Sequence, residues 1–259
     1  MLDAVAEARD LERALLAAGN PERAEQERRY LKSQLRHYGV SVPLVRRAAA
    51  GVRRAWPERP RRDVVALVEA LWERPVHECR AAAVELLELY LDRLVARDLA
   101  LVERLLRESG TWALVDNLAA SVAGPLVERF PALAGELDRW AADDDFWIRR
   151  SALLAELIPL REGRGDFPRF GRHADAMLEE KEFFIRKAIG WTLRDTSRKR
   201  PDLVSAWLLP RAARASGVTL REAVKYLPAA ASRRILAAAA AGGVASGVIK
   251  ADATARRKS

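Results

Sequence analysis

The chain is poor in the residues that build disulfide frameworks and metal sites. Its 259 residues include one cysteine, two methionines and three histidines. A single cysteine excludes a disulfide within the chain and is typical of a reducing compartment, so we expect Cys79 to pack in the core as a small apolar residue. His37, His77 and His173 lie far apart in the sequence, with no cysteine or acid at the intervals of a zinc site. We therefore predict no metal ion and no cofactor.

Signals for membrane insertion, export and common enzyme classes are also missing. The longest apolar stretch, residues 235–249, is too short to span a bilayer. The N-terminus is acidic and lacks the basic and apolar layout of a signal peptide. No phosphate-binding loop, GxGxxG or GxSxG is present, which argues against nucleotide-dependent and common hydrolase chemistry. We predict a cytoplasmic protein.

What the chain does contain indicates helices. Alanine, leucine, arginine and glutamate dominate, and these residues are good helix formers. Apolar residues recur at helical spacing over 64–71 and 86–94, and prolines recur where helices are expected to start or end. There is no alternating stretch long enough for a strand and no Asn-Gly or Asp-Gly turn. The sequence predicts an all-α fold, with its clearest loop over residues 161–172.

A repeat of about 35 residues organises the expected helices. The steps between its aligned positions are 34, 36, 33, 37 and 35 residues, and those positions are Arg46, Arg80, Asp116, Arg149, Arg186 and Arg221. A period of this length is typical of stacked helical pairs. We predict one repeat domain over residues 1–249 that curls into a superhelical solenoid with a concave groove, followed by a basic, disordered tail over 250–259.

The charge balance indicates the kind of partner. The chain has 45 Lys+Arg against 36 Asp+Glu, a net charge of +9. Such an excess favours a polyanionic partner. Arginines scattered over solvated faces are the alternative, but the aligned arginines favour clustering on one face. A basic groove suits a nucleic-acid duplex.

Asp116 interrupts the row of aligned arginines. A lone carboxylate among cations is costly unless it has a function, so Asp116 is the first candidate for one. Trp112 lies four residues earlier, on the same face of a helix. Trp191 follows Gly190, which permits a close approach to the backbone. We expect four other tryptophans to be core residues, namely Trp56, Trp72, Trp140 and Trp207.

Four motifs make the chain similar to a known family. The stretches that carry the similarity are Tyr30–Lys32 with the following Tyr38–Val40, Trp112–Asp116, Asp144–Ala152 and Lys181–Arg194. The last is the most specific of them. With matching repeats on either side, these stretches make the chain resemble the AlkD-like DNA alkylation repair glycosylases, which are built from HEAT-like repeats.

The resemblance implies an N-glycosyl hydrolase of base excision repair. Such an enzyme excises cationic alkylated purines, 3-methyladenine and 7-methylguanine, from double-stranded DNA without flipping the base. By position, the resemblance implies that Asp116 stabilises the cationic sugar of the transition state, with Trp112 and Trp191 against the lesion nucleotide.

The same resemblance implies which residues contact DNA. By position these residues are Arg150, Arg194 and Tyr30. Arg149 and Lys187, which stand at or beside repeat positions, are further candidates for phosphate contacts. We expect the protein to act as a monomer.

Ala113 departs from the family pattern, because the family usually has a first acid at this position. One carboxylate therefore remains where the motif has two. This departure favours an alternative, a DNA-binding repeat protein without catalysis that recognises damaged or branched DNA. A protein-interaction scaffold is a third possibility, and the basic excess disfavours it.

Overall fold

The computed structural model describes residues 3–255, and the side chains of residues 3–242. Within this part of the chain no strand occurs, and helices follow one another throughout. The predicted all-α, helical-repeat fold is confirmed. Contacts divide the chain into two compact units, residues 1–137 and 138–259, and each is described by itself. A single domain over residues 1–249 stays a prediction.

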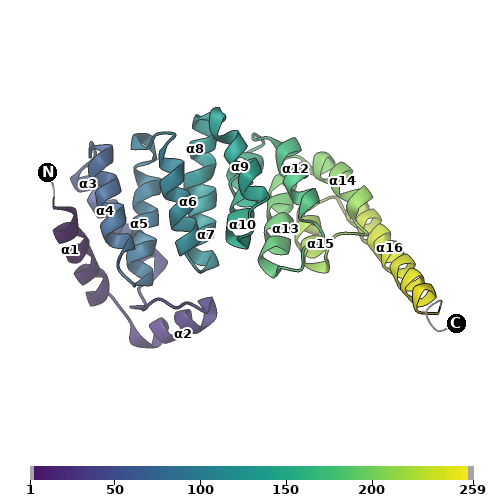
Figure 1. Cartoon of the computed structure of the whole chain (residues 1–259), viewed down its shortest axis with the longest axis horizontal. Helices are drawn as coiled ribbons and strands as arrows, with labels where there is room; N and C mark the ends of the chain where they lie inside the picture. The colour runs from purple at the N-terminus through teal and green to yellow at the C-terminus, as the bar shows by residue number, and fades with distance from the viewer. Residues whose placement is uncertain (1–2, 256–259) are drawn as a thin grey trace. The chain divides into compact units, whose positions relative to one another are not determined.

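The N-terminal unit is built from helical pairs (Figure 1). Its elements are α1 (Ala4–Ala17), α2 (Pro21–Leu31), α3 (Val42–Ala55), α4 (Arg61–Trp72), α5 (His77–Leu89), η1 (Leu91–Arg93), α6 (Asp98–Glu108), α7 (Trp112–Asn117), η2 (Leu118–Ala123), α8 (Gly124–Arg129) and η3 (Pro131–Leu133). Helix α9 (Ala134–Ala141) crosses the boundary between the units.

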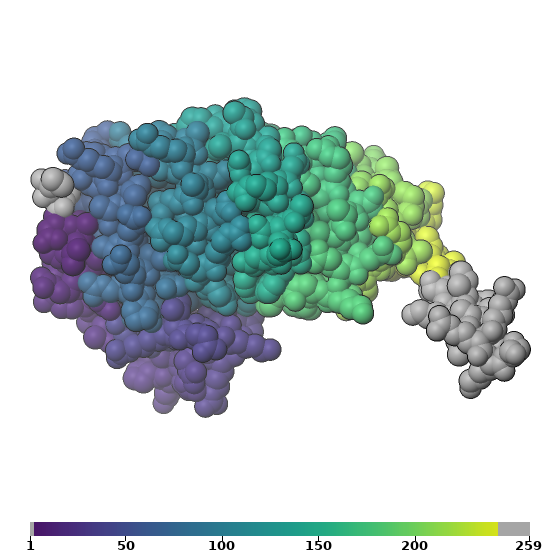
Figure 2. All heavy atoms as spheres, in the orientation of Figure 1, coloured from purple at the N-terminus to yellow at the C-terminus, as the bar shows by residue number. Residues whose placement is uncertain are grey.

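Two layers form in the N-terminal unit. Helices α3, α5 and α7 pack in sequence and make one layer, while α4 packs against both α1 and α5. Helix α2 runs across the ends of the others (Figure 1) and stands out from the surface of the unit (Figure 2). The repeat predicted from Arg46, Arg80 and Asp116 therefore corresponds to the stacked helices α3, α5 and α7.

The C-terminal unit repeats this arrangement. Its elements are α10 (Phe146–Leu154), α11 (Leu157–Arg161), α12 (Phe167–Ala176), α13 (Phe183–Ser197), α14 (Pro201–Leu208), η4 (Leu209–Arg211), α15 (Gly217–Ala223), η5 (Val224–Tyr226) and α16 (Ala229–Ala255). Helix α13 packs against α10 on one side and α15 on the other. A Cβ at Gly190 would lie 2.8 Å from Glu222 Cβ, so this glycine lets α15 approach α13 closely.

Local sequence explains where several helices begin. Pro21, Pro43 and Pro201 lie in the first turn of α2, α3 and α14, where the missing N–H costs nothing. The side chain of Asp166 accepts a hydrogen bond from the backbone at Arg169 and caps α12. The loop predicted over residues 161–172 is therefore shorter, because this cap starts α12 at Phe167.

The core confirms some expectations about single residues and corrects one. Cys79 is buried, and burial raises the pKa of its thiol to about 12. Trp72 and Trp140 are core residues as predicted. The prediction for Trp56 is wrong: this residue ends α3 and is 48% exposed.

Helix α16 extends into the segment predicted to be a basic tail, since it ends at Ala255. The side chains of residues 243–259, and residues 256–259 altogether, lie outside the described part of the chain, so the tail stays a prediction. Of the helices that the structure describes, none combines the length and the apolar character that a membrane span requires.

Candidate functional site

Three of the aligned arginines, Arg80, Arg149 and Arg186, donate hydrogen bonds to backbone carbonyls. Arg149 Nη1 donates to the carbonyls of Asp143 and Asp144, at 2.7 and 2.8 Å. Arg186 Nε donates to Glu180 O at 2.6 Å. In both repeats the cation ties the start of its helix to the end of the preceding segment. The row of arginines that the sequence shows is thus largely a structural device.

Arg80 makes this contact twice. Its Nε donates to Trp72 O at 3.1 Å, within its own repeat, and its Nη1 donates to Glu108 O at 2.7 Å, in the next repeat. Trp72 lies eight residues before Arg80, and Glu108 lies eight residues before Asp116. Arg80 therefore anchors a carbonyl of the next repeat, just before the helix that carries Asp116.

Substitution of Arg80 should destabilise the protein more than its exposure suggests. Arg80→Ala removes charged hydrogen bonds to two carbonyls, so we expect the free energy of unfolding to fall by about 2 kcal/mol. Arg104 on α6 forms exposed ion pairs with Glu69 and Glu108, and Arg104→Ala should cost about 0.5 kcal/mol or less. Urea unfolding of both variants measures the difference. Equal midpoints would show that the double contact carries little energy.

Asp116 lies half-buried on α7, one turn after the half-buried Trp112. The Tyr30 ring meets the Trp112 ring edge-on, with centroids 5.9 Å apart. Tyr30 is 73% exposed and belongs to α2, so two elements far apart in the sequence bring their aromatic rings to one place. The structure thus adds Tyr30 to Trp112 and Asp116, which the sequence had already placed on one face of a helix.

The helix that carries Asp116 changes its winding directly after it. Residues Leu118–Ala123 are π-helical, between α7 and α8. Pro125 follows within the same continuous helix and has no N–H for an ordinary helical bond, while its ring crowds the carbonyl of Ser121. A widened turn relieves this crowding. Such turns occur often at functional sites.

The sequence did not predict a polar cluster next to Asp116. Asn117 Nδ2 donates to Glu85 Oε1 at 3.3 Å, and Arg46 Nε pairs with the same oxygen at 3.0 Å. The three residues come from α7, α5 and α3, one from each stacked helix. Their spacing of roughly one repeat is the signal that would have revealed them.

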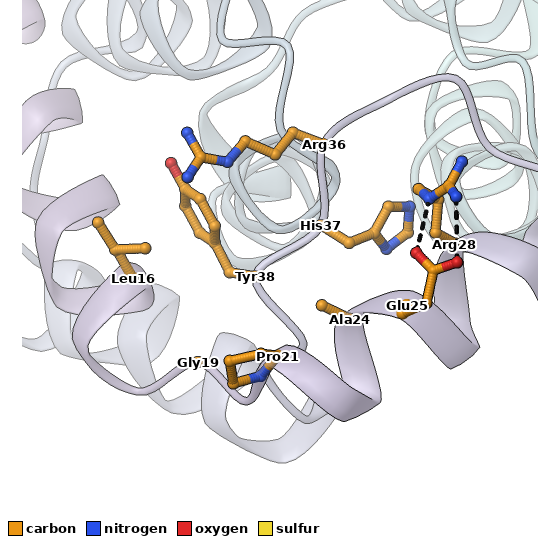
Figure 3. Close-up of a pocket in the computed structure, with 9 residues that line it drawn as sticks. All are labelled: Leu16, Gly19, Pro21, Ala24, Glu25, Arg28, Arg36, His37 and Tyr38. Atoms are coloured by element: carbon orange, nitrogen blue, oxygen red, sulfur yellow. Dashed lines mark hydrogen bonds and ion pairs between the residues drawn. The ribbon is translucent and has the colours of Figure 1, made fainter.

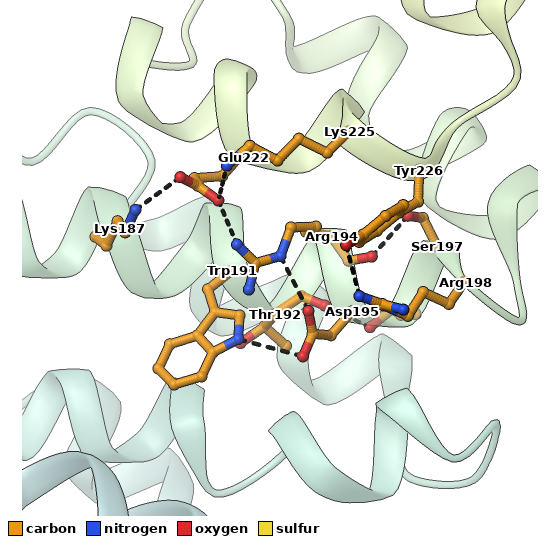
Figure 4. A network of polar contacts seen from close by, with 11 residues as sticks. Lys187, Trp191, Thr192, Arg194, Asp195, Ser197, Arg198, Glu222, Lys225 and Tyr226 are labelled. Carbon is orange, nitrogen blue, oxygen red and sulfur yellow. Dashed lines mark hydrogen bonds and ion pairs between the residues drawn. The ribbon is translucent and has the colours of Figure 1, made fainter.

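Three candidate residues of the C-terminal unit, Lys187, Trp191 and Arg194, belong to one polar network (Figure 4). Glu222 on α15 accepts from Lys187 at 2.7 Å and from Arg194 at 2.6 Å. Arg194 also pairs with Asp195 at 3.0 Å. Trp191 Nε1 donates to the other oxygen of Asp195 at 3.2 Å, which fixes the orientation of the indole. Trp191, Lys187 and Arg194 therefore occupy one surface of α13.

The network keeps its charges over a wide pH range. Burial by itself raises the pKa of Glu222, but hydrogen bonds from Lys187 and Lys225 outweigh it and lower this pKa from 4.5 to about 2. A carboxyl with a lowered folded pKa stabilises the protein above its ordinary value. That contribution is lost as the pH falls from 4.5 towards 2.

Arg149 and Arg150 are engaged within the protein. Arg149 forms a two-pronged ion pair with Glu180, at 2.9 and 3.0 Å, besides its carbonyl contacts. Arg150 is 2% exposed and donates to Phe184 O, with its guanidinium carbon 5.7 Å from the Phe184 ring centre. In this arrangement Arg150 joins α10 to α13, and Arg149 joins α10 to the segment just before α13. Their predicted contacts with phosphates stay predictions, and the burial of Arg150 disfavours a direct contact.

Two of the three histidines, which lie far apart in the sequence, come together in the structure. The rings of His37 and His77 stack, with centroids 4.5 Å apart and planes 9° apart. They are one repeat apart in the sequence, and repeats bring such residues together. Glu27, His37 and Glu78 have ligand atoms within 4.8 Å of one another, so these residues are able to approach a common metal ion.

A family profile described as "DNA alkylation repair enzyme" matches residues 11–227. The chain belongs to this family. A role in the repair of alkylated DNA, and DNA as the partner, follow from that membership. No curated protein sequence matches the chain.

Solved structures of other proteins share the fold of this chain. A "predicted DNA alkylation repair enzyme" from Enterococcus faecalis is 24% identical, with a TM-score of 0.73 over 82% of this chain and 97% of that one. AlkD2 from Streptococcus mutans is 19% identical, with a TM-score of 0.57 over 73% and 91%. At these identities the two structures support the fold alone.

Proposed function

We propose that the protein is a DNA glycosylase that removes 3-methyladenine and 7-methylguanine from duplex DNA. The observation that carries the proposal is Asp116, an acid at the aligned position of the repeat, one helical turn after Trp112, whose ring meets the Tyr30 ring. Arg80 reaches from the preceding repeat to the Glu108 carbonyl, just before the helix that carries Asp116. A function for the carboxylate at the surface of α7 accounts for an acid at this position.

The chemistry is hydrolysis of the N-glycosidic bond. Alkylation at N3 or N7 makes the base cationic, so the base leaves as a neutral purine with the bonding electron pair and needs no strong general acid. The deoxyribose then carries positive charge, as sugars do in glycoside hydrolysis. The Asp116 carboxylate stabilises that charge and orients a water molecule. The water adds to C1′ and loses a proton, which leaves an abasic site.

The indoles and cations hold the damaged strand. Trp112 of the N-terminal unit offers a ring face that favours positive charge on the nucleotide, and Trp191 of the C-terminal unit offers a ring face to the DNA strand. Lys187, Arg194 and Tyr30 contact the backbone, and the ionic network around Glu222 fixes the first two of these. Arg149 and Arg150 act indirectly by holding α13. The base stays outside a deep pocket, so selectivity comes from the weakness of the alkylated bond.

A base-release assay tests the proposal. Duplex DNA treated with a methylating agent is incubated with the protein, and freed bases are identified by mass spectrometry. Release of 3-methyladenine or 7-methylguanine supports the glycosylase. Ala113, which leaves one acid in the motif, favours the second candidate, a DNA-binding protein without catalysis. Tight binding without release would establish that candidate instead.

Lys187 offers a clean test of the phosphate contacts, because its side chain is 39% exposed. Lys187→Ala should weaken binding to any duplex and reduce the slope of log K against log salt by about 0.9, the value for one phosphate contact. Arg62→Ala is the control, since Arg62 is an exposed cation on α4, outside the layer of α3, α5 and α7. Fluorescence anisotropy at several salt concentrations measures both slopes. An unchanged slope for Lys187→Ala would remove this residue from the interface.

A further inference from the structure

We propose that Glu27, His37 and Glu78 form a binding site for one divalent transition-metal ion, with zinc as the natural occupant. The three residues come from α2, from the segment that follows it, and from the first turn of α5. Their ligand atoms lie within 4.8 Å of one another. All belong to the N-terminal unit, and none takes part in the proposed excision of bases.

His37 supplies the main observation. It is 8% exposed, and neither of its ring nitrogens has a hydrogen-bond partner. Buried polar groups without a partner are rare and call for an explanation, of which a bound ion is one. Burial lowers the pKa of His37, which favours the neutral imidazole that binds metals. Stacking on His77 fixes the plane of the ring.

Glu78 is held as a metal ligand would be held. It is 1% exposed, and its Oε1 accepts hydrogen bonds from the backbone N–H groups of Tyr38, Gly39 and Val40, at 3.0, 2.6 and 3.2 Å. Its Oε2 accepts a hydrogen bond from the Tyr38 N–H at 3.0 Å, and an oxygen has two lone pairs. Oε2 therefore retains a lone pair for a cation. Hydrogen bonds of this kind orient the ligands of metal sites.

Glu27 completes the set from α2. Arg23 donates to its Oε1 at 2.7 Å, and Glu27 itself is half-buried. Ligands of a tetrahedral zinc ion lie roughly 3.4 Å apart, so binding draws the Glu27 carboxylate inward by about an ångström. A half-buried side chain on a helix that stands out from its unit is able to make this movement (Figure 2).

The ligand chemistry and the access favour zinc. Two carboxylates and one neutral imidazole offset the charge of a divalent ion, and three protein ligands leave a fourth position for water. The Cys79 thiol, beside Glu78, is fully buried and takes no part. Figure 3 shows the His37 ring turned towards α2, beside a cavity of about 440 Å³ that Arg28, Arg36 and Tyr38 help to line. This cavity gives an ion a path to the ring.

The site would join α2 to α5. Because α2 also carries Tyr30, whose ring rests against Trp112, a bound ion stabilises the placement of Tyr30. The inference does not depend on the proposed function, since metal binding is measured without DNA.

The test uses the untagged full chain, stripped of metal with a chelator. Zn²⁺ is titrated by calorimetry, and Co²⁺ is followed by its visible absorption bands. We expect one ion per chain. His37→Phe keeps the stack but removes the ring nitrogens, and Glu27→Gln removes a surface carboxylate; each should weaken binding at least about tenfold. The matched control is His77→Phe, which keeps the same stack and should bind within about threefold of the original chain.

Circular dichroism monitors the folding of every variant. If His37→Phe proves unfolded, Glu27→Gln decides the question, because its side chain is not part of the core. The absence of one-to-one binding would overturn the proposal. So would full affinity in a folded His37→Phe or in Glu27→Gln, or an equal loss in His77→Phe.

Discussion

Asp116→Asn should lower the release of methylated purines by about 100-fold or more, since it removes the charge that stabilises the sugar cation and keeps the shape of the side chain. Duplex binding should stay close to that of the original chain, because a neutral amide repels phosphates no more than a carboxylate does. Release of 7-methylguanine is measured by mass spectrometry, and binding to unmodified duplex by anisotropy.

The matched control for this substitution is Asp63→Asn. Asp63 is also a half-buried aspartate of the N-terminal unit, but it lies on α4 and pairs with Arg62 at 3.4 Å. Its variant should release bases at the original rate. If Asp116→Asn releases bases as fast as Asp63→Asn does, the carboxylate has no part in the chemistry, and the proposed mechanism fails.

Glu78→Ala should destabilise the N-terminal unit by about 4 kcal/mol, because it leaves the N–H groups of Tyr38, Gly39 and Val40 buried without an acceptor. Each orphaned donor costs about 1–3 kcal/mol. Residues 38–40 lie outside any helix. Among the described residues between α2 and α3, the one element of regular structure is an isolated bridge between Arg36 and Val76. Urea unfolding, followed by circular dichroism in the presence of a chelator, measures the loss.

A second glutamate provides the comparison. Glu73 ends α4, is exposed, and lies five residues before Glu78. Glu73→Ala should change the free energy of unfolding by no more than about 0.5 kcal/mol. Glu78→Gln keeps one acceptor oxygen and should fall between the two. A loss for Glu78→Ala no larger than that of Glu73→Ala would contradict this account.

The repeat was visible in the sequence because each helical pair needs the same few contacts. The aligned arginines mark the starts of α3, α5, α10, α13 and α15, and the exception at Asp116 was visible for the same reason. The motifs around Trp112 and Trp191 indicated the family that the profile then matched over residues 11–227.

Other features depend on packing between repeats, which periodicity does not determine. Arg150 follows Arg149 by about 100° around the helix, and only the position of α13 decides that its guanidinium is buried against Phe184. His37 and His77 are distant in the sequence, and the stack between them follows from the register of α2 and its following segment against α5. The exposure of Trp56 follows from the end of α3, which the apolar pattern did not mark.

Arg80 has a consequence for how such proteins diversify. Because Arg80 anchors two carbonyls, one of them in the next repeat, the segment that carries Asp116 depends on a contact from the preceding repeat. The acid and its supporting contact therefore come from different helical pairs. A chimera that received α6 and α7 of this protein would gain Asp116 without Arg80, because Arg80 lies on α5. Transfer of α5 together with α6 and α7 would keep the contact between Arg80 and Glu108.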